Sequence, residues 1–271
     1  VIMQAQVLEG VADLLASGLL LVGVKRAKLP FDKQHPYGYG QELYLWTFLS
    51  ALATFFLSAV ASFLLGLKRF YFPLEVDHLV LSIIVLAITV VTNGYAMSLS
   101  LKRLKNKNGL GKNCRAFFHP KMIETKTTFI SDLMGTSSSV LGLLALLIYQ
   151  LTGNFQFDSL GAMTIGVVLA VLAFLLLKIA KNLLVGQSAS PETEKKIKKI
   201  VHSFNQVKKI IKLKTLQLGP NNLLISLDLH LDEELKTEEI ETVINQIETK
   251  IKETIPQAGD VQIEPESLKN N

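Results

Sequence analysis

The chain has 271 residues, of which 49% are hydrophobic, and a mean hydropathy of +0.35. The apolar residues come in long runs, which argues for a membrane protein and against a soluble globular one. The net charge of +5 does not call for a nucleic-acid partner, because the basic residues gather in loops beside the apolar runs. The single cysteine, Cys114, excludes an intrachain disulfide and any zinc site with two or more cysteines.

Five apolar runs are long enough to cross a hydrocarbon core of about 30 Å, which takes about 20 helical residues. We place these spans at 4–24, 43–67, 79–101, 124–151 and 159–183. Residues from 187 onward are rich in Lys and Glu and have shorter apolar runs. The sequence therefore predicts an all-α membrane bundle over 1–186, followed by a small soluble domain over 187–271.

Basic residues mark two of the four loops between these spans. Lys25, Arg26 and Lys28 follow the first span, and a longer series follows the third: Lys102, Arg103, Lys105, Lys107, Lys112 and Arg115. The other two loops hold few basic residues or none. By the positive-inside rule, the rich loops and the C-terminal domain are cytoplasmic. Five spans then leave the N-terminus on the outer side, and we expect a further helix before Val1.

Three acids interrupt the apolar spans. Glu9 and Asp13 lie four residues apart in the first, so both carboxylates share one helix face. Asp132 lies early in the fourth span and reaches the depth of Asp13 only if its helix begins near Phe117. A carboxylate at the bilayer centre costs about 2.5–3.5 kcal/mol, so these acids are expected to face the bundle interior. They indicate either a divalent-cation site or polar contacts between helices.

The soluble domain reads as αββαβ. Ser190 and Pro191 predict the start of a helix, and 211–217 alternates as a strand that ends at the turn 219–222. A second strand is expected at 223–231, an amphipathic helix at 237–255 and a short strand at 261–263. This order predicts a small α+β sheet with both helices on one face. Because its core is small, dimerisation through this domain is expected.

The chain resembles the cation diffusion facilitator (zinc transporter) family, in particular its zinc-transporter-nine branch. The resemblance rests on Glu9-x-x-x-Asp13, on Ser131-Asp132, and on two longer motifs: His35-Pro36-Tyr37-Gly38-Tyr39-Gly40 and Gly186-Gln187-Ser188-Ala189-Ser190-Pro191-Glu192. It implies six membrane helices, of which this chain lacks the first, and a cytoplasmic αββαβ domain, like half of a ferredoxin-like fold, that forms a homodimer.

The resemblance also implies a transport site built from two helices, here Glu9 with Asp13 and Thr128 with Asp132. Threonine occupies a position where the family carries histidine or aspartate. An oxygen-only site suits Mn²⁺ or Fe²⁺ better than Zn²⁺, although zinc also accepts carboxylates. The expected function is export of a divalent cation from the cytoplasm in exchange for protons. The alternative is a transport-poor partner subunit or scaffold. We find no nucleophile–base pair, phosphate-binding loop or catalytic metal motif that would indicate an enzyme.

Other polar residues have two interpretations each. Asp32 and His35 are expected to form a turn rather than a loop ion site. Asp228, Glu264 and Glu266 fall where relatives place regulatory metal ligands, but acids instead of histidines predict a weak site. Asn93 either touches the ion path or bonds a neighbouring helix. The remaining histidines are expected to be surface or packing residues: His119, His202 and His230.

Overall fold

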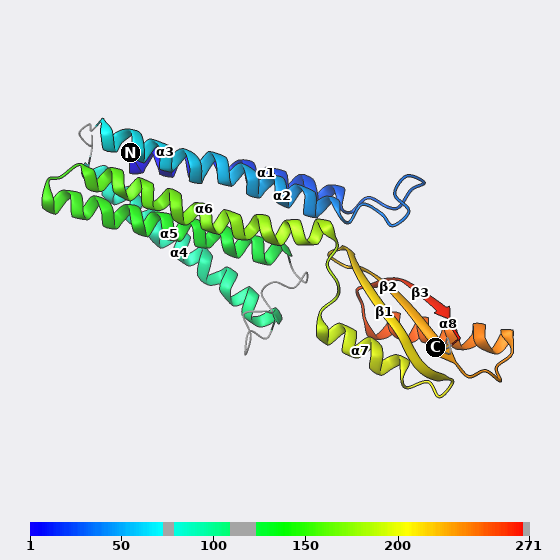
Figure 1. Cartoon of the computed structure of the whole chain (residues 1–271). Helices are drawn as coiled ribbons and strands as arrows, with labels where there is room; N and C mark the ends of the chain where they lie inside the picture. Colours follow the sequence, from blue (N-terminus) through cyan, green and yellow to red (C-terminus); the bar gives the residue numbers. More distant parts are fainter. Residues whose placement is uncertain (73–78, 109–122, 268–271) are drawn as a thin grey trace. The chain divides into compact units, whose positions relative to one another are not determined.

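A computed structural model describes residues 1–72, 79–108 and 123–267 of the chain. These residues divide into a helical unit and an α+β unit, labelled in Figure 1. Cys114, His119 and the helix start expected near Phe117 lie outside the described residues.

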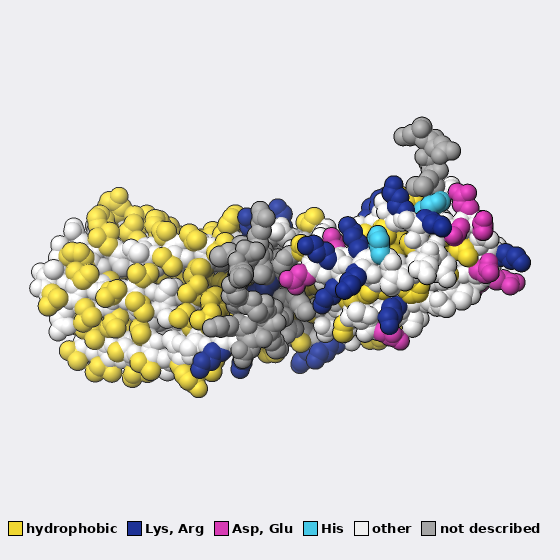
Figure 2. Space-filling model, turned by 90° about the horizontal axis from the view of Figure 1, so that it is seen from below, with side chains coloured by type: hydrophobic (Ala, Val, Ile, Leu, Met, Phe, Trp, Pro, Cys, Tyr) yellow, Lys and Arg dark blue, Asp and Glu magenta, His cyan; other side chains and the backbone are white. Residues whose placement is uncertain are grey.

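The helical unit holds five helices that are long and apolar enough to cross a membrane. They are α1 (Ile2–Arg26), the continuous run α2 (Glu42–Thr54), η1 (Phe55–Val60) and α3 (Ala61–Tyr71), then α4 (Leu79–Asn108), α5 (Ile123–Thr152) and α6 (Gln156–Val185). The five predicted spans are therefore confirmed within the described residues. Hydrophobic side chains are spread over the face of this unit that Figure 2 shows. Leu14 is 78% exposed, as a lipid-facing residue would be.

Small residues bring the helices of this unit close together. A Cβ atom at Gly66 of α3 would lie 2.7 Å from the Met163 side chain of α6, and one at Gly166 would lie 2.7 Å from the backbone nitrogen of Phe63. Ser58 and Ser62 are also fully buried. Small residues allow this close approach, and dispersion contacts rather than water exclusion then hold the helices together.

The α+β unit contains α7 (Pro191–Val201), β1 (Val207–Gly219), β2 (Asn222–Leu231), α8 (Thr237–Thr254) and β3 (Ala258–Pro265). The sheet order is β1-β2-β3; β1 and β2 are antiparallel, and β2 and β3 are parallel. Both helices cover one face of the sheet, where Leu227 of β2 shares a buried apolar core with Ile197 of α7 and Ile247 of α8. The αββαβ prediction is thus confirmed.

The first strand is longer than the sequence pattern predicts, since β1 begins at Val207 rather than near Ile211. Its pairing with β2 has irregularities between Val207 and Lys209 and between Ile210 and Lys212. Each irregularity interrupts the alternation of side chains between the two faces of the sheet, and this alternation is the sequence pattern by which a strand is recognised. Because the lysines and isoleucines here are consecutive, their pattern does not indicate a strand.

The loop Arg26–Gln41 belongs to the α+β unit. Asp32 accepts hydrogen bonds from the backbone nitrogens of Gln34 and His35 and, at 2.7 Å, from the Tyr39 hydroxyl. These bonds, the Tyr39 bond foremost, lower the pKa of Asp32. Both carboxylate oxygens thus take part in closing the turn expected from this motif.

The same loop docks on the turn between β1 and β2. The Asn222 side-chain amide donates to the carbonyl oxygen of Tyr37 at 3.3 Å. A Cβ atom at Gly40 would lie 2.5 Å from the carbonyl oxygen of Leu218, so only glycine allows this approach. The other loop glycine, Gly38, adopts the left-handed region at φ 80°. Backbone geometry and packing therefore explain why this motif holds two glycines.

Candidate metal site

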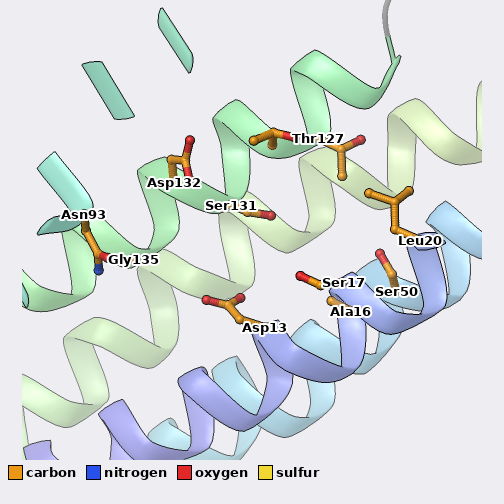
Figure 3. Close-up of a pocket in the computed structure, with 11 residues that line it drawn as sticks. Asp13, Ala16, Ser17, Leu20, Ser50, Asn93, Thr127, Ser131, Asp132 and Gly135 are labelled. Atoms are coloured by element: carbon orange, nitrogen blue, oxygen red, sulfur yellow. The ribbon is translucent and has the colours of Figure 1, made fainter. Parts of the chain in front are cut away.

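Helices α1 and α5 place two acids on a shared cavity of about 220 Å³. Figure 3 shows where these residues lie, with Asp13 and Ser17 on α1 and with Ser131 and Asp132 on α5. Asp13 and Ser17 lie on one helix face, because four residues make about one turn. Helices α2 and α4 complete the lining with Ser50 and Asn93.

The chemistry of the cavity is that of oxygen ligands. Two carboxylates face it, together with further polar side chains: Ser17, Ser50, Asn93, Thr127, Thr128 and Ser131. The residues that line it in the described part of the chain include no Lys, Arg or His. A water needs only about 10–15 Å³ of such volume, so the cavity has room for an ion that keeps part of its hydration shell. The ionised carboxylates would attract a cation, and none of these lining side chains carries a positive charge that would compete.

Glu9 lies one turn away from this cavity along α1 and is not among its lining residues. It is 5% exposed, and its Oε2 accepts hydrogen bonds from Ser138 at 2.5 Å and Gln6 at 3.3 Å. Its Oε1 is buried and has no hydrogen-bond partner among the described residues. Glu9 therefore contacts α5 at a position six residues beyond Asp132, away from the cavity that Asp13 lines.

Asn93 reaches the cavity because α5 carries a glycine opposite it. A Cβ atom at Gly135 would lie 2.8 Å from Asn93 Nδ2. The Asn93 amide donates to the Ser139 hydroxyl at 3.3 Å, so it makes an interhelical bond and lines the cavity at the same time. Both interpretations of Asn93 given by the sequence are compatible with this position.

The structure brings together three of the four predicted ligands, Asp13, Thr128 and Asp132, and leaves Glu9 outside their cavity. Whether any of them binds an ion stays a prediction. Sequence reasoning did not identify Ser17 or Ser131 as cavity residues. Ser17 follows Asp13 by four residues, a spacing that could have placed it on the same face.

The acids of the α+β unit are arranged differently. Asp228 on β2 is the register partner of Glu264 on β3, and Lys212 Nζ lies 4.0 Å from an Asp228 oxygen. The carbonyl oxygen of Glu266 lies 3.2 Å from His230 Nδ1. No group of three or more His, Cys, Asp or Glu side chains in the described part of the chain is arranged to hold a metal ion.

Comparison with known families decides what kind of protein this is. The cation efflux transmembrane domain model matches residues 1–185, and the model of the cation efflux protein cytoplasmic domain matches residues 189–267. The chain belongs to the cation efflux family. It is therefore a multi-pass membrane protein with a cytoplasmic C-terminal domain, and it is not an enzyme.

Individual relatives of this cation efflux protein are distant. The mitochondrial proton-coupled zinc antiporter SLC30A9 of Xenopus laevis is 24% identical over 90% of this chain and 45% of its own length. Metal tolerance protein C4 of Arabidopsis thaliana is 22% identical over 82% of this chain and 49% of its own. The Mus musculus SLC30A9 antiporter is 23% identical over 80% and 39%. The chain spans less than half the length of each of these relatives.

Proposed function

We propose that this cation efflux protein exports a divalent metal cation from the cytoplasm in exchange for protons, working as a homodimer. The observation that carries the proposal is the cavity that Asp13 of α1 and Asp132 of α5 both line, with no basic side chain among the described lining residues. The family membership gives the coarser function, metal cation efflux. The relatives named as proton-coupled zinc antiporters support the exchange mechanism.

Carboxylates suit this exchange because metal and protons compete for the same oxygens. Cytoplasmic metal would displace protons from Asp13 and Asp132, and protons from the other side would later release the metal. Rocking of the helices around a fixed midplane site would expose the cavity to each side in turn. Glycine contacts such as those of Gly66 and Gly166 leave the α3–α6 pair as a closely packed element for such motion.

Mn²⁺ or Fe²⁺ is the substrate that the oxygen ligands fit best, and Zn²⁺ is the substrate named for the relatives. Thr128 accounts for this preference, because a hydroxyl in place of imidazole removes the soft nitrogen donor that zinc favours. Thr128 lies on the wall of the cavity that also holds the two acids.

The decisive experiment is metal-driven proton flux in liposomes that contain the purified protein. A gradient of Mn²⁺, Fe²⁺ or Zn²⁺ should drive protons in the opposite direction, as read by a pH-sensitive dye. Asp13→Asn keeps the side-chain shape but removes the charge that balances the ion, so it should reduce flux to that of protein-free liposomes. Wild-type flux in Asp13→Asn would show that Asp13 is not a ligand.

The second candidate function is a transport-poor partner subunit. It is favoured by the absence of any group of three His, Cys, Asp or Glu ligands in the described part of the chain. Wild-type protein that forms dimers but carries no metal-driven proton flux for any of the three ions would establish this alternative.

A further inference from the structure

The Ser100 hydroxyl of α4 approaches Asp132 from outside the cavity. Ser100 is 4% exposed and donates a hydrogen bond to Asp132 Oδ2, yet it is not among the residues that line the cavity. The bond joins two helices that pack along each other, α4 and α5. One carboxylate oxygen of Asp132, a residue that lines the cavity, is thereby held by α4.

This hydroxyl has a second acceptor, the carbonyl oxygen of Ala96 one turn earlier in α4, at 3.0 Å. A serine hydroxyl carries one hydrogen, so it donates to one of the two acceptors at a time. A bond to an ionised carboxylate is the stronger of the two. The bond to Asp132 is therefore the one that we expect the hydroxyl to make.

We propose that Ser100 is a positioning residue for the cation site: it fixes the orientation in which Asp132 presents one oxygen to the ion. Carboxylates that bind metals are commonly oriented by such hydrogen bonds, and loss of one costs about 10–100-fold in affinity or activity. This inference rests on the proposed function, in which Asp132 is a ligand. It adds Ser100 of α4 to the residues that build the site.

The test compares Ser100→Ala with Ser98→Ala, an identical change two residues away on the same helix. The Ser98 hydroxyl donates to the carbonyl oxygen of Tyr95 at 2.7 Å and serves as the matched control. Metal dependence of proton flux gives KM and the maximal rate. Ser100→Ala should raise KM about 10-fold, as expected for lost orientation of a ligand, with the maximal rate nearly unchanged. Ser98→Ala should match wild type, and Ser100→Thr, which keeps the hydroxyl, should restore KM.

A direct binding titration with Mn²⁺ and Zn²⁺ on detergent-purified protein separates this inference from the proposed function. If wild type binds metal but shows no flux, the transport proposal fails, and the ratio of dissociation constants between Ser100→Ala and wild type still tests Ser100. If Asp132→Asn weakens binding and Ser100→Ala does not, the positioning role is wrong although the site stands. Should Ser100→Ala fail to fold, Ser100→Cys replaces it: its weak donor should give an affinity below that of Ser100→Thr, and equal affinities would overturn the inference.

Discussion

Each unit of the molecule contains a pair of acidic residues, and the two pairs differ in whether a basic side chain lies beside them. In the helical unit, Asp13 and Asp132 share a cavity whose described lining residues include no Lys, Arg or His. In the α+β unit, Asp228 and Glu264 are register partners on parallel strands, and Lys212 lies 4.0 Å from Asp228. A pair of acids is therefore a candidate ion site where the side chains around it leave the negative charge unbalanced.

The same substitution made in each unit tests this difference. Asp132→Asn should abolish metal-driven flux, because the amide keeps the shape and loses the charge that would balance the ion. Asp228→Asn should leave flux close to wild type, since Asp228 lies beside Lys212 in the α+β unit and is not among the residues that line the cavity. Parallel flux assays in liposomes, with size-exclusion profiles to confirm dimers, measure both. Equal loss in the two variants would remove the distinction between the units.

Within the helical unit, we expect a substitution of Glu9 to reduce flux less than a substitution of Asp13. Its contacts with Ser138 and Gln6 place it outside the cavity that Asp13 lines. Glu9→Gln should therefore reduce flux less than Asp13→Asn, which should abolish it. The measurement is the initial rate of flux in the two variants at matched protein density. Complete loss in Glu9→Gln would show that Glu9 reaches the ion in another state of the transporter.

A substitution at Thr128 tests which divalent cation the two acids of the cavity, Asp13 and Asp132, prefer. Thr128→His should shift the preference from Mn²⁺ or Fe²⁺ toward Zn²⁺, because imidazole adds a nitrogen donor beside the two carboxylates. Competition between the ions for flux or binding gives the selectivity ratio. Tight zinc binding by the wild type, with unchanged selectivity in Thr128→His, would contradict an oxygen-only site.

The sequence predicted the elements of both units well because each has a strong hydrophobic period. Apolar runs of about 20 residues identified the spans, and the positions of Asp13 and Asp132 within theirs pointed to the site. The sequence did not separate Glu9 from the cavity, because the contact of Glu9 with Ser138 depends on how α1 and α5 are rotated about their axes. That rotation is set by packing, such as Gly135 against Asn93, which no local pattern reveals.

The contact between Ser100 and Asp132 was unpredictable for the same reason, since the two residues lie on different helices. In the α+β unit, the start of β1 was missed because its irregular pairing with β2 disrupts alternation. The docking of Tyr37 on Asn222 was also missed, because it joins the loop after α1 to a turn far along the chain. The elements follow from local periodicity, whereas these contacts follow from tertiary packing.

We expect the smallest effect in the cytoplasmic domain, whose thermal stability should hardly change when metal is added. Residues 187–271 expressed alone should fold, because α7, β2 and α8 share an apolar core that lies within this range. We expect the folded domain to form a soluble dimer. A metal present at 100 times its dissociation constant would stabilise the folded form by about 2.7 kcal/mol. In a domain of this size, that would raise the melting temperature by about 10–20 °C.

Thermal melts with and without micromolar Zn²⁺ and Mn²⁺ therefore distinguish the two cases. We expect a shift within the error of the measurement, because Lys212 already lies beside Asp228, and Glu266 meets His230 through its backbone carbonyl. The same melts on the Lys212→Ala variant provide the complementary measurement. By removing the positive charge beside Asp228, this substitution should make the melting temperature more responsive to metal than that of the wild type. A large shift in the melting temperature of the wild-type domain would show that its acids bind metal despite Lys212. The two units would then differ in their affinity for metal, and not in whether they bind it.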